Sequence, residues 1–123
     1  MAKKILVIED EKTLRFLVTK ILAEEGFEVD EAIDGEQGLE KAKQNKPDLI
    51  LLDLRLPGIN GFDVLTEIKK DAQLESTEVI ILSNLGQKEE IEKGMNLGAT
   101  DYMIKAHFTL DEIVTRVKRI LKI

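Results

Sequence analysis

The sequence contains no cysteine and only one histidine among its 123 residues. Without cysteine, the chain can form no disulfide framework, no thiolate metal site and no cysteine nucleophile. The lone histidine, His107, has no partner histidine, which disfavours a role as phosphate carrier or metal ligand. Basic side chains are also fewer than acidic ones, 18 against 24, and the net charge is −6. This balance argues against non-specific nucleic-acid binding, so we expect no direct nucleic-acid partner.

Long hydrophobic runs are absent as well. The first apolar stretch, residues 5–8, is too short for the core of a signal peptide and far too short to cross a bilayer. We therefore expect no membrane partner and a cytoplasmic protein. Apolar residues make up 43% and charged residues 34% of the chain, which is typical of a globular protein. The length suits one domain, so we expect residues 1–123 to form a single unit.

Five short segments have the pattern of β-strands. Four are continuous apolar runs, as expected of strands covered on both faces, at residues 5–8, 49–52, 79–82 and 102–104. The segment 27–32 instead alternates apolar and polar residues, which fits an edge strand.

Helical periodicity occupies the intervals between these strands. The predicted helices lie at residues 14–22, 35–45, 61–72, 87–97 and 110–121. Gly26 and Gly98 are the expected ends of the first and fourth helices, and Thr109 with Glu112 forms a capping box before the last. Strand and helix thus alternate five times. This order predicts an α/β fold, a doubly wound five-stranded parallel sheet with helices on both faces.

Polar side chains follow four of the predicted strands: Glu9 and Asp10, Asp53, Ser83 and Lys105. The carboxyl ends of parallel strands share one edge of the sheet, where open α/β sheets bind ligands, so we expect these residues to converge. Three clustered carboxylates repel one another unless a cation neutralises them, and carboxylates are usual ligands of Mg²⁺. An aspartate can also act as a nucleophile toward a phosphoryl group, with a lysine and a hydroxyl holding the phosphoryl oxygens. Positioning and charge neutralisation of this kind are most of what phosphoryl transfer requires.

These residues resemble the motifs of a known family, the receiver domains of two-component response regulators. The similar motifs are Ile8-Glu9-Asp10-Glu11, Leu52-Asp53-Leu54-Arg55-Leu56-Pro57-Gly58 with Gly61, Leu82-Ser83, and Asp101-Tyr102-Met103-Ile104-Lys105. The resemblance covers the whole chain, so residues 1–123 would be a single receiver domain. It implies a flavodoxin-like sheet with the strand order 2-1-3-4-5.

The resemblance also implies roles for individual residues. Asp53 would be the phosphoacceptor, and Mg²⁺ would be held by Glu9, Asp10, Asp53 and the main-chain carbonyl of Arg55. Lys105 and Ser83 would contact the phosphate, and Ser83 with Tyr102 would form a switch that alters the face made by the fourth helix, fifth strand and fifth helix.

The partners implied are a histidine kinase or histidine phosphotransfer protein as donor and an unknown output protein or output domain. Leu14 and Phe16, in the first helix, are candidates for docking the donor. Such a protein accepts a phosphoryl group and loses it again, but is not a conventional enzyme.

Three positions depart from the family pattern. Ala106 follows Lys105 where the family usually has proline. A cis bond before a residue other than proline costs about 3–4 kcal/mol, so we expect a trans bond here. Arg55 is large for a position two residues past the acceptor and can reach over the site. Asn84 stands where a smaller residue is common and would narrow access to the acyl phosphate.

Other interpretations remain open from the sequence. A haloacid-dehalogenase-type phosphohydrolase also uses a strand-end aspartate, but it carries a second aspartate where this chain has Arg55. A phosphate-independent pseudo-receiver is the other alternative. Glu9 and Asp10 could serve as caps of the first helix. The basic side chains of the last helix are expected to form a solvated face: Arg116, Lys118, Arg119 and Lys122.

Overall fold

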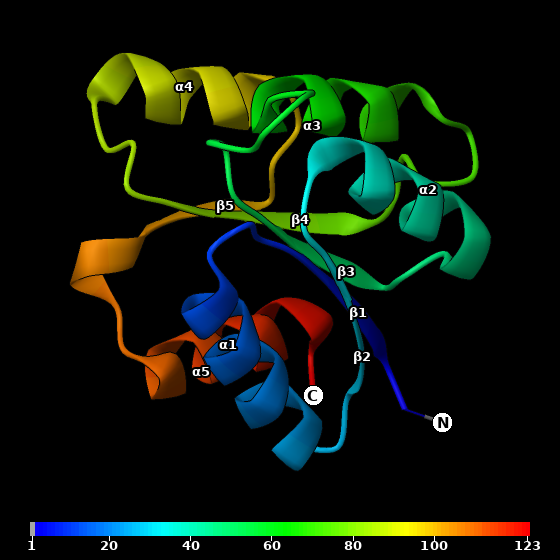
Figure 1. Ribbon diagram of the computed structural model, residues 1–123, viewed down its shortest axis with the longest axis vertical. Coiled ribbons are helices and arrows are strands. Elements are labelled where there is room, and N and C mark those ends of the chain that lie inside the picture. The colour runs from blue at the N-terminus through cyan, green and yellow to red at the C-terminus, as the bar shows by residue number, and fades with distance from the viewer. Residues whose placement is uncertain (1) are drawn as a thin grey trace.

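A parallel sheet forms the middle layer of the structure, a computed structural model that describes residues 2–123 (Figure 1). Within that range the sheet has five strands: β1 (Lys4–Ile8), β2 (Glu28–Ala32), β3 (Leu49–Leu52), β4 (Glu78–Ser83) and β5 (Asp101–Ile104). They lie side by side in the order β2-β1-β3-β4-β5, and every neighbouring pair is parallel. The predicted strand order is confirmed, and the alternating segment is indeed an edge strand.

Helices cover both faces of the sheet. They are α1 (Lys12–Glu24), α2 (Gly35–Asn45), α3 (Gly61–Lys70), α4 (Lys88–Asn96) and α5 (Leu110–Leu121), with a short 3₁₀ turn η1 (Lys105–His107) before α5. Figure 1 shows α1 and α5 together on one face and α2, α3 and α4 on the other. The predicted bounds of the third and fourth helices were slightly wrong: α3 ends at Lys70 and α4 at Asn96.

Two apolar layers follow from this arrangement, because successive side chains of a strand point to opposite faces. Ile5 and Val7 of β1 pack with the buried side chains of α1 and α5. Leu6 and Ile8 pack with those of α2 and α3 on the other side. A strand covered on both faces has no solvent-facing positions, which explains why β1, β3 and β4 have continuous apolar runs.

The helix ends follow local sequence signals. Gly26 and Gly98 adopt φ values of +95° and +108° after α1 and α4, and each allows the chain to fold back onto the last helical carbonyls. The capping box of Thr109 and Glu112 is present at the start of α5. The suggestion that Glu9 or Asp10 caps the first helix is wrong, because Glu11 occupies the N-cap position of α1. In the described part of the chain, no helix is long and apolar enough to span a membrane.

Candidate functional site

Three carboxylates meet at the carboxyl edge of the sheet. Glu9 and Asp10 follow β1, and Asp53 follows β3, the strand that pairs directly with β1 through Ile8 and Leu52. The ladder continues one step further, since the Asp53 N–H donates to the Ile8 carbonyl at 3.0 Å. One oxygen from each carboxylate lies within 4.8 Å of the others. Adjacent strand ends therefore bring the three acids together, as the parallel topology predicts.

The ammonium of Lys105 lies among these acids. Its Nζ is 2.7 Å from Glu9 Oε1 and 3.1 Å from Asp53 Oδ2. Burial opposes the charge of Lys105, but the hydrogen bond to Glu9 and the negative charge of Asp53 outweigh it and raise the pKa of the ammonium. Burial raises the pKa of Glu9 to about 7, although the bond from Lys105 acts in the opposite direction. Burial thus disfavours the ionised form of Glu9, and the hydrogen bond from the Lys105 ammonium favours it.

Main-chain donors fix the remaining carboxylate oxygens. The Glu11 N–H donates to Glu9 Oε2 at 3.0 Å, and the Arg55 N–H donates to Asp53 Oδ1 at 3.3 Å. Glu9 and Asp53 are only 4% and 5% exposed, whereas Asp10 is open to solvent. The site therefore combines two oriented, buried carboxylates with one at the entrance.

The donor set fits Mg²⁺. It consists of carboxylate oxygens, the hard ligands that this ion prefers, and opposite ligands of the ion lie about 4 Å apart. That separation is close to the 4.8 Å span of the three carboxylates. A positive group, the Lys105 ammonium, already lies between two of them, which shows that the cluster accommodates a cation.

Ser83 and Tyr102 are linked through one residue of the β4–α4 connection. Ser83 is fully buried at the end of β4, and its Oγ accepts a hydrogen bond from the Leu85 N–H at 3.3 Å. The Tyr102 hydroxyl, from β5, donates to the carbonyl of the same Leu85. The Tyr102 ring lies against α4 at Gly94, where an added Cβ would come within 3.3 Å of the ring. Burial, with the charges of Glu90 and Asp53, raises the pKa of Tyr102 to about 12.

The other predicted positions lie around this centre. The Arg55 and Asn84 side chains are exposed, as is His107. Phe16 is 61% exposed on α1, while Leu14 is half-buried against the core between the sheet and α1. The Lys105–Ala106 bond is trans, as expected, since the chain from residue 2 to 123 contains no cis peptide.

Two sets of contacts were missed by the sequence analysis. Arg15 donates to the main-chain carbonyls of Glu9 and Asp10 behind the acidic cluster. Arg116 does not lie on a purely solvated face, because it pairs with Asp101 of β5 and its guanidinium lies 5.3 Å from the Phe108 ring centroid. The only available signal was a charged residue on an amphipathic helix. That signal is common on exposed helix faces and predicts no particular contact.

A doubly wound parallel sheet with three acids, a buried hydroxyl and a lysine at its carboxyl edge defines a flavodoxin-like α/β protein. The family profile of the response regulator receiver domain matches residues 5–118. The chain therefore belongs to the response regulator receiver domain family of two-component signal transduction.

Individual relatives agree with this assignment. Response regulator ArlR of Staphylococcus saprophyticus is 38% identical over 119 residues, covering 97% of this chain and 52% of ArlR. The phosphate regulon transcriptional regulatory protein PhoB of Escherichia coli is 35% identical over 122 residues, covering 99% of this chain and 53% of PhoB. The chain thus spans about half the length of these curated relatives. A CheY-like response regulator receiver domain protein of Methanospirillum hungatei has a similar solved structure, with a TM-score of 0.93, 25% identity, and coverage of 99% and 95% of the two chains.

Proposed function

We propose that this chain accepts a phosphoryl group on Asp53, with Mg²⁺, from a histidine-phosphorylated kinase or phosphotransfer protein. The observation that carries the proposal is the buried Asp53 carboxylate, 3.1 Å from the Lys105 ammonium and clustered with Glu9 and Asp10. A carboxylate in this position is a nucleophile whose surroundings are already arranged for the charges of a phosphoryl group.

The ion supplies positive charge that offsets the negative charge of the phosphoryl oxygens, and its ligands would be Glu9, Asp10, Asp53 and the main-chain carbonyl of Arg55. In the transfer, a bond forms between an Asp53 carboxylate oxygen and phosphorus as the phosphorus–nitrogen bond of phosphohistidine breaks. The imidazole nitrogen leaves with the electron pair and takes up a proton. Lys105 then holds a phosphoryl oxygen as a point charge.

Ser83 connects this event to the rest of the molecule. Its Oγ accepts a bond from the Leu85 N–H, so its own O–H proton can donate to a phosphoryl oxygen on Asp53. A shift of Ser83 toward the phosphate would move Leu85, whose carbonyl accepts the Tyr102 hydroxyl proton. Tyr102 lies against α4, so the displacement would reach the face formed by α4, β5 and α5. This face is the output surface in the proposal, recognised by an output protein or output domain.

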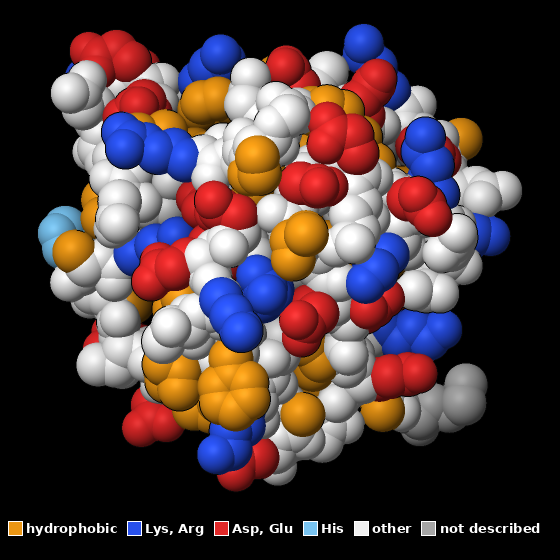
Figure 2. Space-filling view, viewed as in Figure 1, with side chains coloured by type: hydrophobic (Ala, Val, Ile, Leu, Met, Phe, Trp, Pro, Cys, Tyr) orange, Lys and Arg blue, Asp and Glu red, His pale blue; other side chains and the backbone are white. Residues whose placement is uncertain are grey.

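The phosphodonor would approach over α1. Figure 2 shows hydrophobic side chains gathered over α1 and the start of α5. The exposed Phe16 is the proposed contact there, and Leu14 supports it from the half-buried side of the helix. An exposed aromatic on the helix that follows the reacting edge gives a partner an apolar anchor.

The same features favour a receiver over the two alternatives. A haloacid-dehalogenase-type hydrolase needs a second aspartate as general acid at the position of Arg55, whose side chain points to solvent. A pseudo-receiver needs no oriented carboxylates, yet Glu9 and Asp53 each accept a main-chain hydrogen bond. In this proposal residues 1–123 act as one receiver unit that turns over only its own phosphoryl group and is not a conventional enzyme.

Phosphoryl uptake tests the proposal. With Mg²⁺ and acetyl phosphate as a small donor, intact-mass analysis should show one phosphoryl group that is labile in base. Asp53→Asn should abolish uptake, because an amide is not a nucleophile here. Asp111→Asn, an exposed position on α5, is the matched control and should retain full uptake. Uptake that persists in Asp53→Asn, or a wild-type chain that takes up none, would show the proposal to be wrong.

A further inference from the structure

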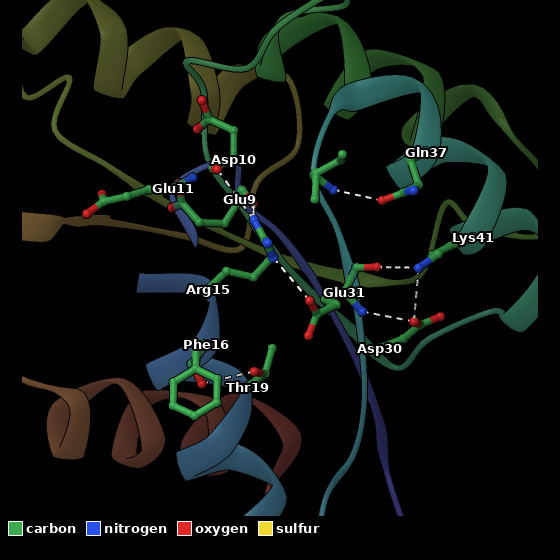
Figure 3. Close-up of polar contacts among 11 residues, drawn as sticks. Glu9, Asp10, Glu11, Arg15, Phe16, Thr19, Asp30, Glu31, Gln37 and Lys41 are labelled. Carbon is green, nitrogen blue, oxygen red and sulfur yellow. Dashed lines mark hydrogen bonds and ion pairs between the residues drawn. The ribbon is translucent and has the colours of Figure 1, made fainter. Parts of the chain in front are cut away.

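Arg15 lies beneath the turn that carries two of the three clustered acids. Its Nη1 donates to the Glu9 carbonyl at 2.9 Å and lies 3.4 Å from the Asp10 carbonyl. Its Nε donates to Glu31 Oε1 at 3.1 Å. Figure 3 shows the side chain reaching from α1 toward Glu9 on one side and Glu31 on the other. One guanidinium therefore joins α1, the β1–α1 turn and the edge strand β2.

The contacts of Arg15 differ from those of an exposed surface ion pair. Its side chain is 13% exposed, so the guanidinium is largely removed from water. Glu31 pairs with Val7 in the β1–β2 ladder, and the last ladder bond beyond β1 runs from the Glu9 N–H to the Ala32 carbonyl. Past that point, the turn leaves the sheet and its carbonyls receive hydrogen bonds from Arg15. The planar guanidinium offers several donors in a fixed arrangement, which suits two successive carbonyls and a carboxylate at once.

We propose that Arg15 is a positioning residue of the acidic site, holding the Glu9–Asp10 main chain so that both carboxylates face Asp53, with Glu31 as its anchor. The proposal rests on the proposed function, because it takes Mg²⁺ as the ligand of these acids. Arg15 acts only through the main chain. The residues that orient ligands in this way commonly change metal affinity by about 10- to 100-fold when they are replaced.

The charge of Arg15 and its positioning role predict opposite changes in Mg²⁺ affinity when the residue is replaced, which makes the proposal testable. Removing a positive charge close to three carboxylates should by itself strengthen binding of a divalent cation. Loss of the Arg15 hydrogen bonds to the turn should weaken Mg²⁺ binding, because the carboxylates no longer lie in the arrangement that the ion needs. The sign of the change in Mg²⁺ affinity therefore separates the two effects.

The experiment measures Mg²⁺ dissociation constants by isothermal titration calorimetry, and Mn²⁺ binding by paramagnetic resonance as a second readout. Arg15→Gln should weaken binding about tenfold, the lower end of that range, and Arg15→Lys should also weaken it because a lysine keeps the charge but lacks the planar donors. Lys12→Gln is the matched control, an exposed lysine three residues earlier on α1, and should leave affinity unchanged or slightly stronger.

Glu31→Gln tests the anchor and provides a second route if Arg15→Gln does not fold. It should weaken Mg²⁺ binding less than Arg15→Gln, and the double variant should bind no more weakly than Arg15→Gln alone, because the two residues act in series. Wild-type affinity in folded Arg15→Gln, or in Glu31→Gln when Arg15→Gln does not fold, would overturn the positioning role and leave the proposed function intact. A wild-type chain that binds no Mg²⁺ would overturn both.

Discussion

The carboxylates of Glu9 and Asp53 share a single ammonium, that of Lys105, at 2.7 and 3.1 Å. The sequence predicts three acids that repel one another until a metal arrives. The structure shows instead that a lysine from β5's carboxyl end offsets part of this repulsion without metal. In the proposed transfer, Lys105 would exchange partners, from the carboxylates of Glu9 and Asp53 to a phosphoryl oxygen. This exchange keeps a positive charge in the site at every stage of the proposed transfer.

Tyr102 allows a direct test at the scale of one residue, because the chain has one tyrosine and no tryptophan. Its ultraviolet absorbance change on ionisation reports this hydroxyl alone. In the folded chain the midpoint should lie near pH 12, because burial and the charges of Glu90 and Asp53 raise the pKa to about 12. In denaturant the midpoint should fall to about 10, the value of an unperturbed tyrosine.

The sign of the effect on stability follows from that shift. The folded state retains the proton of Tyr102 at pH values where the unfolded state has lost it. The contribution to stability is thus complete below about pH 10 and is lost as the pH rises toward about 12. Glu90→Gln should lower the folded midpoint. A folded midpoint near 10 in the wild-type chain would contradict the buried, acid-flanked environment of the hydroxyl.

Helix ends show how an element can carry local strain. α1 and α4 end with glycines of positive φ, but α2 ends at Lys46 with a φ of +46°. A residue with a Cβ pays a steric cost of about 1–2 kcal/mol in this left-handed conformation, whereas glycine adopts it freely. The Lys46 N–H still closes the helix by donating to the Ala42 carbonyl at 2.9 Å, so the end of α2 is well formed despite the strain.

Lys46→Gly should therefore raise the free energy of unfolding by about 0.5–1 kcal/mol, once the greater flexibility of glycine in the unfolded chain is subtracted. Lys43→Gly, at an exposed position inside α2, is a control with the same loss of charge and should lower the free energy of unfolding by about 1 kcal/mol. Urea denaturation of both variants gives the comparison. A loss of stability in Lys46→Gly similar to that in Lys43→Gly would show that the left-handed end carries no strain.

For the molecule as a whole, the acidic site, the surface of α1 and the α4–β5–α5 face have different expected roles. The site lies at the carboxyl edge, the exposed Phe16 lies on α1, and the proposed output face is formed by α4, β5 and α5. In the proposal, the acidic site and the output face are connected through Ser83, Leu85 and Tyr102, which two hydrogen bonds to Leu85 link. Phosphorylation would shift the equilibrium between two conformations of this segment.

Ser83→Ala should uncouple the acidic site from the α4–β5–α5 face. The variant should still take up phosphate on Asp53, because its nucleophile and acidic cluster are intact. In the wild-type chain, uptake should change amide hydrogen exchange in α4 and β5, and in Ser83→Ala this change should be absent. Ser76→Ala, in the loop before β4, is the control for loss of a hydroxyl and should respond as wild type does. An unaltered exchange response in Ser83→Ala would exclude the route through Leu85.

The sequence pattern by itself determined the fold class and the edge at which the site lies, whereas the strand order was expected only from the family resemblance. Apolar runs such as residues 5–8 and 49–52 define buried strands, and the alternation of strands with helices requires parallel connections. Once the strands are parallel, residues at their carboxyl ends, Asp10 and Asp53 among them, must share an edge. The trans bond before Ala106 was also predictable, because a cis bond before a residue other than proline has a local energetic cost.

Only the tertiary structure decided which side chains pair across that edge. The contacts of Arg15 with Glu31, of Lys105 with Glu9, and of Arg116 with Asp101 join residues of different elements. Each depends on the spacing between packed layers and on the rotamer that fits there. Hydrophobic periodicity carries no information about either, since it specifies which face of an element is buried and not which neighbour a long polar side chain will reach.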